Sequence, residues 1–453
     1  MQKGKESVMD EVLEKKRRVS PWIIIILGFA AVILAGTVLL MLPISSGDGR
    51  SASFGDSLFT AVSAVCVTGL TVKDTASCWS GFGQGVLLIL IQIGGLGVVT
   101  VAAAVTMLSG RKFSLFTRST MQNAMSAPKL GGIVRLTKFV LKGTFTVELI
   151  GTAVLIPAFV SRFGAKGVWF AVFHSVSAFC NAGFDIMGAE TGRFSSLTAF
   201  SANAAVTLPV MLLIMIGGIG FLTWDDIRKN RFKVSKYSMQ TKVVLTAAGV
   251  LILIPALWLF FTDMRSLPLG ERMLASLFQA VTPRTAGFNT FDLTELSGPS
   301  KCITTALMLI GGSPGSTAGG MKTTTFVLLA ANVVSVFKKK EDAELFGRRI
   351  KPAAVRTAGA LFIMYLALFL VGAAAISSIE GLPMEDCLFE TASALGTVGL
   401  SLGITPGLGT ASRCILMLLM FMGRVGGLTF VYAFLSSSNR TNSKLPIESI
   451  MVG

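Results

Sequence analysis

The chain has 453 residues, of which 52% are hydrophobic and 14% are charged, with a net charge of +16 and a mean hydropathy of +0.71. Soluble domains carry about 25% charged residues. A soluble fold of this length would need polar surface that is missing here, whereas helices surrounded by hydrocarbon need none. The composition therefore excludes an ordinary soluble protein and predicts an all-α membrane protein.

The basic residues lie in patches between apolar runs. Of the 40 Lys and Arg residues, 28 fall in 1–20, 109–142, 225–242, 337–356 and 435–453. By the positive-inside rule, this asymmetry predicts that both termini of a multi-pass protein are cytoplasmic. No nucleic acid is expected as a partner, because the basic loops also carry acidic residues and lack interleaved aromatic residues.

The six cysteines are scattered and show no short paired spacing. Neither a disulfide framework nor a zinc site is indicated. The chain has no phosphate-cradling GxxxxGK[ST] motif. Control by a nucleotide would therefore require another chain.

A polar tail, 1–20, precedes the first apolar run, which is too long for the core of a signal peptide and is predicted to be a retained span. A second polar tail, 436–453, follows the last run. Eight transmembrane helices are predicted, at 21–42, 82–108, 134–160, 200–223, 241–261, 302–336, 356–379 and 411–435.

A shorter segment of about a dozen residues lies between the two spans of each successive pair. Each is too short to cross a bilayer of about 30 Å, so we expect it to enter the membrane from the outer side and return. The four copies share a Phe, a Ser or Thr, and a closing Gly followed by Leu or Phe. They read FTAVSAVCVTGL (59–70), FHSVSAFCNAGF (173–184), FQAVTPRTAGF (278–288), which is one residue shorter, and FETASALGTVGL (389–400).

The closing glycines are separated by 114, 104 and 112 residues, enough for one helix, pore loop and helix each. Units with an even number of spans face the same way, as pseudo-fourfold symmetry around one central pore requires. We predict four repeats, at 21–108, 109–224, 225–340 and 341–435.

Four such loops can replace the water shell of a cation with rings of backbone carbonyl oxygens. Lining a filter demands backbone angles that glycine adopts readily, and each short helix would direct its negative C-terminal dipole at the ion. Close helix packing could explain one such glycine, but four in one pattern favour a filter. The predicted ion selectivity filter comprises Val67, Thr68, Gly69, Asn181, Ala182, Gly183, Thr285, Ala286, Gly287, Thr397, Val398 and Gly399.

A glycine motif recurs in the second helix of each repeat: IGGLG (93–97), IGGIG (216–220), IGGSPG (310–315) and, altered, MGRVGG (422–427). In the third copy, proline and glycine disfavour a helix. We therefore predict a movable loop under the filter rather than a simple kink. This predicted gate loop comprises Gly311, Gly312, Ser313, Pro314, Gly315, Ser316, Thr317, Ala318, Gly319 and Gly320.

Two charges fall inside apolar stretches. Arg424 replaces a glycine of the motif near mid-membrane, where an unpaired charge costs a few kcal/mol. We expect it to face the pore and to bond to loop carbonyls. Lys322 is expected either to do the same or to extend to the cytoplasmic edge.

Other ionisable residues have two interpretations each. Glu148 lies mid-span, where it is either functional or paired with a neighbouring span. His174, in the second pore segment, is expected to pack in the core. The outer carboxylates either concentrate cations at the mouth or cap helices. They are Asp56, Asp185, Asp386 and Glu390.

The four loops, with GGSPGSTAGGMKTTT (311–325) and GRVGGLT (423–429), resemble the Trk/Ktr/HKT superfamily of cation transporters over essentially the whole chain. With eight predicted spans, the chain most resembles the KtrB-type membrane subunits of bacterial Ktr potassium uptake systems. The resemblance implies that a glycine at all four filter positions goes with potassium selectivity. It also implies that 311–320 is an intramembrane gate and that Arg424 is a positive charge below the filter.

The resemblance further implies a homodimer in the bacterial cytoplasmic membrane with a cytoplasmic ring of nucleotide-binding subunits of the RCK/KTN type. By the same resemblance we expect membrane lipid around the protein, K+ as the transported ion, and no cofactor on this chain. Potassium/sodium cotransport or less selective cation transport is the alternative, and whether Na+ is required stays open. An alternating-access carrier is disfavoured because such carriers usually show two repeats. An intramembrane enzyme is disfavoured by the single histidine.

Overall fold

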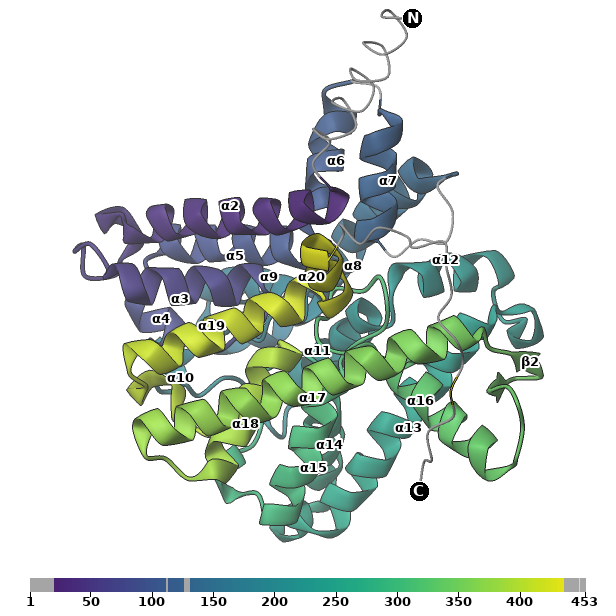
Figure 1. Ribbon diagram of the computed structural model, residues 1–453. Coiled ribbons are helices and arrows are strands. Elements are labelled where there is room, and N and C mark those ends of the chain that lie inside the picture. The colour runs from purple at the N-terminus through teal and green to yellow at the C-terminus, as the bar shows by residue number, and fades with distance from the viewer. Residues whose placement is uncertain (1–19, 111–112, 126–130, 436–447, 449–453) are drawn as a thin grey trace, which may run out of the picture.

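Helices form nearly all of the regular structure in the computed structural model, which describes residues 20–110, 113–125, 131–435 and 448 (Figure 1). The predicted tails, 1–20 and 436–453, therefore lie outside the described residues apart from Ser20 and Glu448. In the described part, the strands are β1 (Glu344–Leu345) and β2 (Arg348–Arg349), an antiparallel hairpin. Short 3₁₀ turns lie at Pro43–Ser45, Thr198–Phe200, Val234–Lys236, Asp263–Ser266, Leu293–Glu295 and Thr405–Gly407.

Four long apolar helices each open one predicted repeat. They have 21, 31, 23 and 29 residues and the composition of membrane spans. At 1.5 Å per residue even the shortest reaches about 31 Å, the thickness of the hydrocarbon core. Large apolar side chains such as Leu34, Leu149, Leu253 and Val371 are exposed on them, as expected for helices that face lipid. The four are α2 (Pro21–Met41), α8 (Ile133–Phe163), α13 (Met239–Phe261) and α17 (Pro352–Glu380).

A helix of 12 to 14 residues follows each long helix and packs against it. At most about 21 Å long, none of these can cross the bilayer. Each contains the first part of one predicted short segment and ends one to four residues before the predicted filter residues. They are α3 (Phe54–Val65), α9 (Lys166–Phe179), α14 (Leu269–Val281) and α18 (Met384–Gly396).

The second spanning segment of every predicted repeat is broken, whereas the sequence predicted a break only in the third. α5 (Gly81–Leu96) and α6 (Val98–Leu108) are bent by 98°, and α11 (Ala204–Gly218) and α12 (Phe221–Asn230) by 95°. α15 (Gly298–Leu309) and α16 (Thr323–Phe337) are separated by a loop, and α19 (Thr410–Val425) is followed by α20 (Gly427–Leu435).

A glycine with positive φ lies at each of the three short breaks, between α5 and α6, α11 and α12, and α19 and α20. Gly97, Gly220 and Gly426 have φ of 84°, 91° and 89°, a conformation that cannot continue a right-handed helix and that glycine adopts at little cost. Each is the glycine that follows the apolar residue in the repeated motif. These positions therefore redirect the chain rather than merely allow close packing.

The second segment of each predicted repeat packs against the short helix of the next one. α5 contacts α9, α11 contacts α14, and α15 contacts α18. α19 then contacts α3, which returns the order to the start of the chain. Figure 1 shows this last contact as the yellow α19 alongside the purple α3.

The described structure contains three further helices, α4, α7 and α10. α7 (Leu115–Ala124) contacts α6, and the two rise away from the rest of the bundle in Figure 1. α4 (Thr75–Cys78) and α10 (Gly188–Thr191) are single turns that contact each other. α4 lies in the loop that follows Gly69 and α10 in the loop that follows Gly183, so their contact connects these two loops.

Candidate functional site

The four predicted filter loops share a backbone feature at their first and last residues. In each loop the first residue and the closing glycine both have positive φ, which costs an ordinary L-residue about 1–2 kcal/mol. Surrounding structure must hold four non-glycine residues in this state. The φ values are 56°, 60°, 66° and 51° at Val67, Asn181, Thr285 and Thr397, and 90°, 67°, 83° and 95° at Gly69, Gly183, Gly287 and Gly399.

The four closing glycines meet in one place. A Cβ on Gly69 would lie 2.5 Å from the carbonyl oxygen of Ala182, and one on Gly183 would lie 2.7 Å from that of Ala286. Gly287 and Gly399 approach the carbonyl oxygens of Val398 and Thr68 in the same way. Each glycine thus abuts the loop of the next predicted repeat, in cyclic order, with no room for a side chain. We call these four residues the glycine ring.

A Ser or Thr near the end of each short helix braces its loop. The Ser63 and Ser393 hydroxyls accept hydrogen bonds from the amides of Gly69 and Gly399, both at 3.0 Å. Ser177 and Thr282 instead donate to the carbonyl oxygens of the residues that follow the glycine, Phe184 and Phe288, at 2.8 and 2.6 Å. The sequence placed these hydroxyls correctly but did not reveal this bracing.

The predicted gate loop is not helical and is held by backbone bonds on both sides. The Ser313 and Thr317 amides donate to the carbonyls of Gly218 and Gly217, at 3.1 and 3.3 Å, and the Gly320 amide donates to that of Gly423 at 3.1 Å. A Cβ on Gly319 would collide with the side chain of Thr397. The loop therefore lies directly against a filter loop, between two of the glycine motifs.

Arg424 and Lys322 both bond to carbonyls of this loop. Arg424 donates through Nη1 to Thr317 and through Nη2 to Gly94 and, at 3.0 Å, to Gly95. Lys322 Nζ donates to Ala318 at 2.8 Å, so of its two expected positions it occupies the one at the loop. The carbonyls of Thr317 and Ala318 belong to the gate loop, as expected from the sequence, whereas those of Gly94 and Gly95 lie at the end of α5. A part of either side chain in gating stays a prediction.

Two cavities lie near the glycine ring. One, of about 820 Å³, is lined by all four of its glycines, and we call it the vestibule. The other, of about 210 Å³, is lined by Arg424, Lys322 and several residues of the gate loop, and by no residue of the ring. The vestibule therefore lies at the glycine ring, and the second cavity lies at the predicted gate loop.

Glu148 and His174 have structural partners. Glu148 Oε2 accepts a hydrogen bond at 3.2 Å from Gln92 on α5, so it pairs with a neighbouring helix, one of its two interpretations. His174 is fully buried, its Nδ1 lies 2.8 Å from the Phe170 carbonyl oxygen, and its ring makes an edge-to-face contact with Phe173. Its prediction as a core residue is confirmed.

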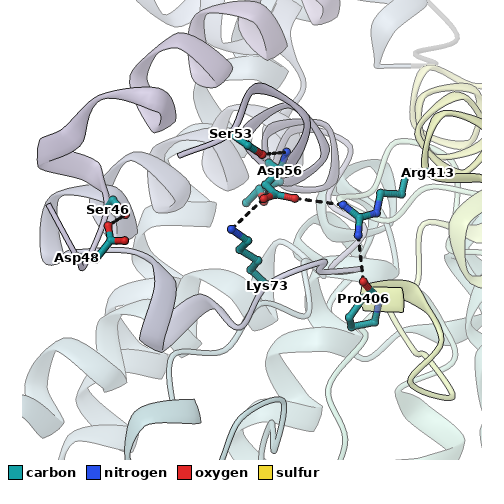
Figure 2. Close-up of polar contacts among 8 residues, drawn as sticks. Ser46, Asp48, Ser53, Asp56, Lys73, Pro406 and Arg413 are labelled. Carbon is teal, nitrogen blue, oxygen red and sulfur yellow. Dashed lines mark hydrogen bonds and ion pairs between the residues drawn. The ribbon is translucent and has the colours of Figure 1, made fainter. Parts of the chain in front are cut away.

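Asp56 joins the first and last predicted repeats. Its carboxylate lies 2.9 Å from Lys73 Nζ and 3.2 Å from Arg413 Nη1 on α19, and Arg413 also donates to the Pro406 carbonyl at 3.0 Å (Figure 2). Burial raises the pKa of this carboxyl, but hydrogen bonds from Lys73 and Ser53 and the two positive charges outweigh that and hold the pKa below its usual range. Asp56 also lies in the first turn of α3, where its charge favours the helix dipole, so of its two expected roles the one at a helix end describes it.

The other three acidic candidates lie in different surroundings. Glu390 is buried and accepts hydrogen bonds from Ser401 and, at 2.8 Å, from Thr405. Asp386 lies in the first turn of α18, where its charge favours the helix dipole. Asp185 lines the vestibule. Among the four, Asp185 is therefore the one placed where a cation would approach the glycine ring.

The sequence did not predict the tight packing at the first glycine of the repeated motif. Cβ atoms on Gly94, Gly217 and Gly423 would collide with carbonyl oxygens at the ends of the short helices of their own repeats. The recurrence of the motif was the signal, but a motif alone does not reveal what its glycine touches.

A sequence model of the TrkH family, described as cation transport protein, matches residues 13–444. The chain is 40% identical to the potassium/sodium uptake protein NtpJ of Enterococcus hirae, over 97% of this chain and 98% of that protein. It is 38% identical to the Ktr system potassium uptake protein B of Bacillus subtilis, over 98% and 99%. The crystal structure of the potassium transporter TrkH from Vibrio parahaemolyticus superposes with a TM-score of 0.72 and 19% identity, covering 92% of this chain and 86% of that one, which supports the fold.

Proposed function

The chain belongs to the TrkH family of cation transport proteins, and from this premise we propose that it takes up potassium across the cytoplasmic membrane through the glycine ring. Its relatives carry potassium uptake in their names. The membrane potential supplies about 2.3 kcal/mol per charge per 100 mV. No enzyme activity is part of this function.

The observation that carries the proposal is the cyclic contact of four glycines with the carbonyls of neighbouring loops. A cation that leaves water needs oxygen atoms in place of its hydration shell, and carbonyls from four loops supply them. In this proposal the filter consists of 67–69, 181–183, 285–287 and 397–399. The ends of four short helices face it with negative dipole charge.

We propose eight spans in four units around one pore, with both termini cytoplasmic. The contacts of α5, α11, α15 and α19 with successive short helices support this arrangement. The basic segments between spans support the orientation. The vestibule is then the outer mouth.

In the proposed mechanism the loop 311–320 obstructs the path below the filter, and Arg424 and Lys322 hold it there. The hydrogen bonds from both side chains to loop carbonyls support this role. A positive charge below the filter also weakens ion binding, which permits release. Opening requires these bonds to break.

We further propose that the chain is the pore-forming subunit of a larger assembly, a homodimer with a cytoplasmic ring of nucleotide-binding subunits. The name of one relative, a protein of a Ktr system, indicates a system of several components. The name of another relative includes both potassium and sodium, which supports a role of sodium in transport. Cotransport of the two ions, or a less selective pore, is therefore the second candidate.

Flux into liposomes that contain the purified protein tests these proposals. Potassium uptake driven by potential alone, without sodium, supports a selective pore. Uptake that requires a sodium gradient supports cotransport instead. Equal fluxes of the two ions in the parent protein would refute potassium selectivity.

A further inference from the structure

A buried carboxyl group contacts the residue that precedes the second filter loop. Glu148, at the middle of α8, is only 5% exposed. Its Oε2 accepts a hydrogen bond from Gln92 Nε2 at 3.2 Å, and its Oε1 lies 3.8 Å from Cys180 Sγ. The same sulfur lies 3.6 Å from Gln92 Oε1. Three side chains, from α5, α8 and the end of α9, thus contact one another in pairs, and we call them the Glu148 triad.

The triad holds no counter-ion for a carboxylate. No ion pair in the described part of the chain includes Glu148. Arg424, which bonds to the next turn of α5, donates to the carbonyl oxygens of Gly94 and Gly95. An unpaired charge inside a membrane protein is costly, and burial favours the neutral form of an acid. A protonated Glu148 avoids that cost.

The hydrogen atoms of the triad also favour a proton on Glu148. Gln92 supplies an N–H to Oε2 of Glu148, whereas the thiol of Cys180 has one hydrogen and two oxygen neighbours. If the thiol donates to Gln92 Oε1, the remaining contact is a hydrogen bond only when Glu148 Oε1 carries a proton and donates to the sulfur, a weak acceptor. All three contacts are then hydrogen bonds, and the triad closes into a ring.

The triad is connected to the filter through Cys180. This residue directly precedes Asn181, the first residue of the second filter loop, whose φ of 60° needs support from its surroundings. A Cβ on Gly95 would lie 2.6 Å from the Cys180 sulfur, so the sulfur packs directly on the backbone of α5. Ser175 of α9 donates to the Glu148 carbonyl at 2.7 Å, which joins α8 to the same short helix. Loss of the triad therefore removes the polar restraints on the residue at which the loop begins.

We propose that Glu148 is protonated and, through Cys180, positions the second filter loop for the selection of potassium. This inference rests on the proposed function and adds a positioning residue to it. A filter loop that moves carries its carbonyl oxygens away from the places where they replace the water of the ion. The buried acid therefore acts on selectivity through the geometry of the loop.

The test compares Glu148→Gln with Glu148→Leu in liposomes, by the fluxes of potassium and sodium at the same potential. The Gln side chain is uncharged and can still accept from Gln92 and donate to Cys180, so this variant should keep the flux ratio of the parent. Glu148→Leu removes the bonds to both partners. A neutral hydrogen bond favours the native position of the loop, so its loss should raise the population of displaced loops, and with it sodium flux, about two- to tenfold. The ratio of potassium to sodium flux falls by the same factor.

A second pair of variants leaves α8 unchanged and decides the question even if Glu148→Leu does not fold. Cys180→Ser keeps a donor and an acceptor at this position, whereas Cys180→Ala keeps neither. We expect the flux ratio of Cys180→Ala to fall as in Glu148→Leu and that of Cys180→Ser to stay near the parent value. An unchanged ratio in either Glu148→Leu or Cys180→Ala, with the protein folded, would overturn the proposal.

Leu155→Ala separates positioning from stability. Leu155 is fully buried, two turns from Glu148 on the same face of α8, so its truncation leaves a cavity and destabilises the protein without removing a bond of the triad. We expect a lower Tm with the flux ratio of the parent. A fall in the ratio as large as in Glu148→Leu would show that selectivity follows stability alone and would overturn the proposal.

Infrared spectroscopy measures the protonation state without transport. A protonated carboxyl has a C=O stretching band that a carboxylate lacks, so the difference spectrum between the parent and Glu148→Gln at neutral pH should contain one such band. Its absence would show that Glu148 is ionised and would overturn the proposal. A parent protein that conducts no potassium contradicts the proposed function instead, while the band still tests the state of Glu148, so the two failures are distinguishable.

Discussion

Replacing Gly69 by Ser should abolish the preference for potassium, because nothing at this position can accommodate a side chain. A Cβ there would lie 2.5 Å from the Ala182 carbonyl oxygen, whereas ordinary contacts begin at 3.4 Å. One of the two loops must therefore move by about 0.9 Å. The left-handed backbone, with φ of 90°, adds about 1–2 kcal/mol of strain for a residue with a Cβ.

A shift of this size moves carbonyl oxygens away from the positions in which they replace the hydration shell of the ion. Each 1.4 kcal/mol of lost discrimination lowers selectivity tenfold. Strain at Gly69 is common to both ions, so the expected loss comes from the displaced carbonyls: if they cost about 1.4 kcal/mol of discrimination, the ratio of potassium to sodium flux falls about tenfold. Parallel liposome assays with the two ions, at the same potential, measure that ratio.

Gly55→Ser is the matched control. Gly55 lies on α3 of the same repeat, and no atom lies within 4 Å of the position that its Cβ would take. The Gly55→Ser variant should therefore show the potassium flux and the flux ratio of the parent protein. If Gly69→Ser keeps the flux ratio of the parent while it folds and conducts, the close approach of the loops does not determine selectivity and the reasoning fails.

Three further predictions concern other contacts. Arg424→Ala removes hydrogen bonds to the Thr317 carbonyl of the gate loop and to the Gly95 carbonyl of α5, worth about 1.5–3 kcal/mol each, so potassium flux should rise at least about tenfold. Gln92→Leu leaves the buried Glu148 carboxyl without its amide donor and should lower the free energy of unfolding by about 1–3 kcal/mol, measured by melting in detergent. Asp56→Asn should lower the free energy of unfolding at pH 7 by about 0.2–1 kcal/mol through loss of its ion pair with Lys73, measured as a lower Tm. Because the pKa of Asp56 is lowered, this difference should vanish as pH falls below the ordinary value of 3.8 and through the folded value.

Each prediction has an outcome that would contradict it. Flux through Arg424→Ala at or below the parent level, with the protein folded, would show that Arg424 does not hold the loop closed. If the Gln92→Leu variant is as stable as the parent protein, Glu148 needs no partner from α5. A Tm difference for Asp56→Asn that persists at pH 2 would show that it does not come from the carboxylate charge.

The sequence alone predicted the class of fold and the location of the main features. Lengths of apolar runs follow from the thickness of the bilayer, so the four long helices could be placed to within a few residues. The four loop glycines and the non-helical segment 311–320 were identifiable because glycine and proline restrict or free the backbone locally. Such properties depend on neighbours in the chain, and a sequence displays them directly.

Tertiary structure alone decided which of these features touch. Arg424 bonds to Gly94 and Gly95, more than 300 positions away, and Asp56 pairs with Arg413 across 357 positions. The loop glycines abut carbonyls of other repeats, and whether Asp56 stays free or is paired depends on where α19 packs. These outcomes depend on how helices distant in the chain pack together, which spacing and composition do not encode locally.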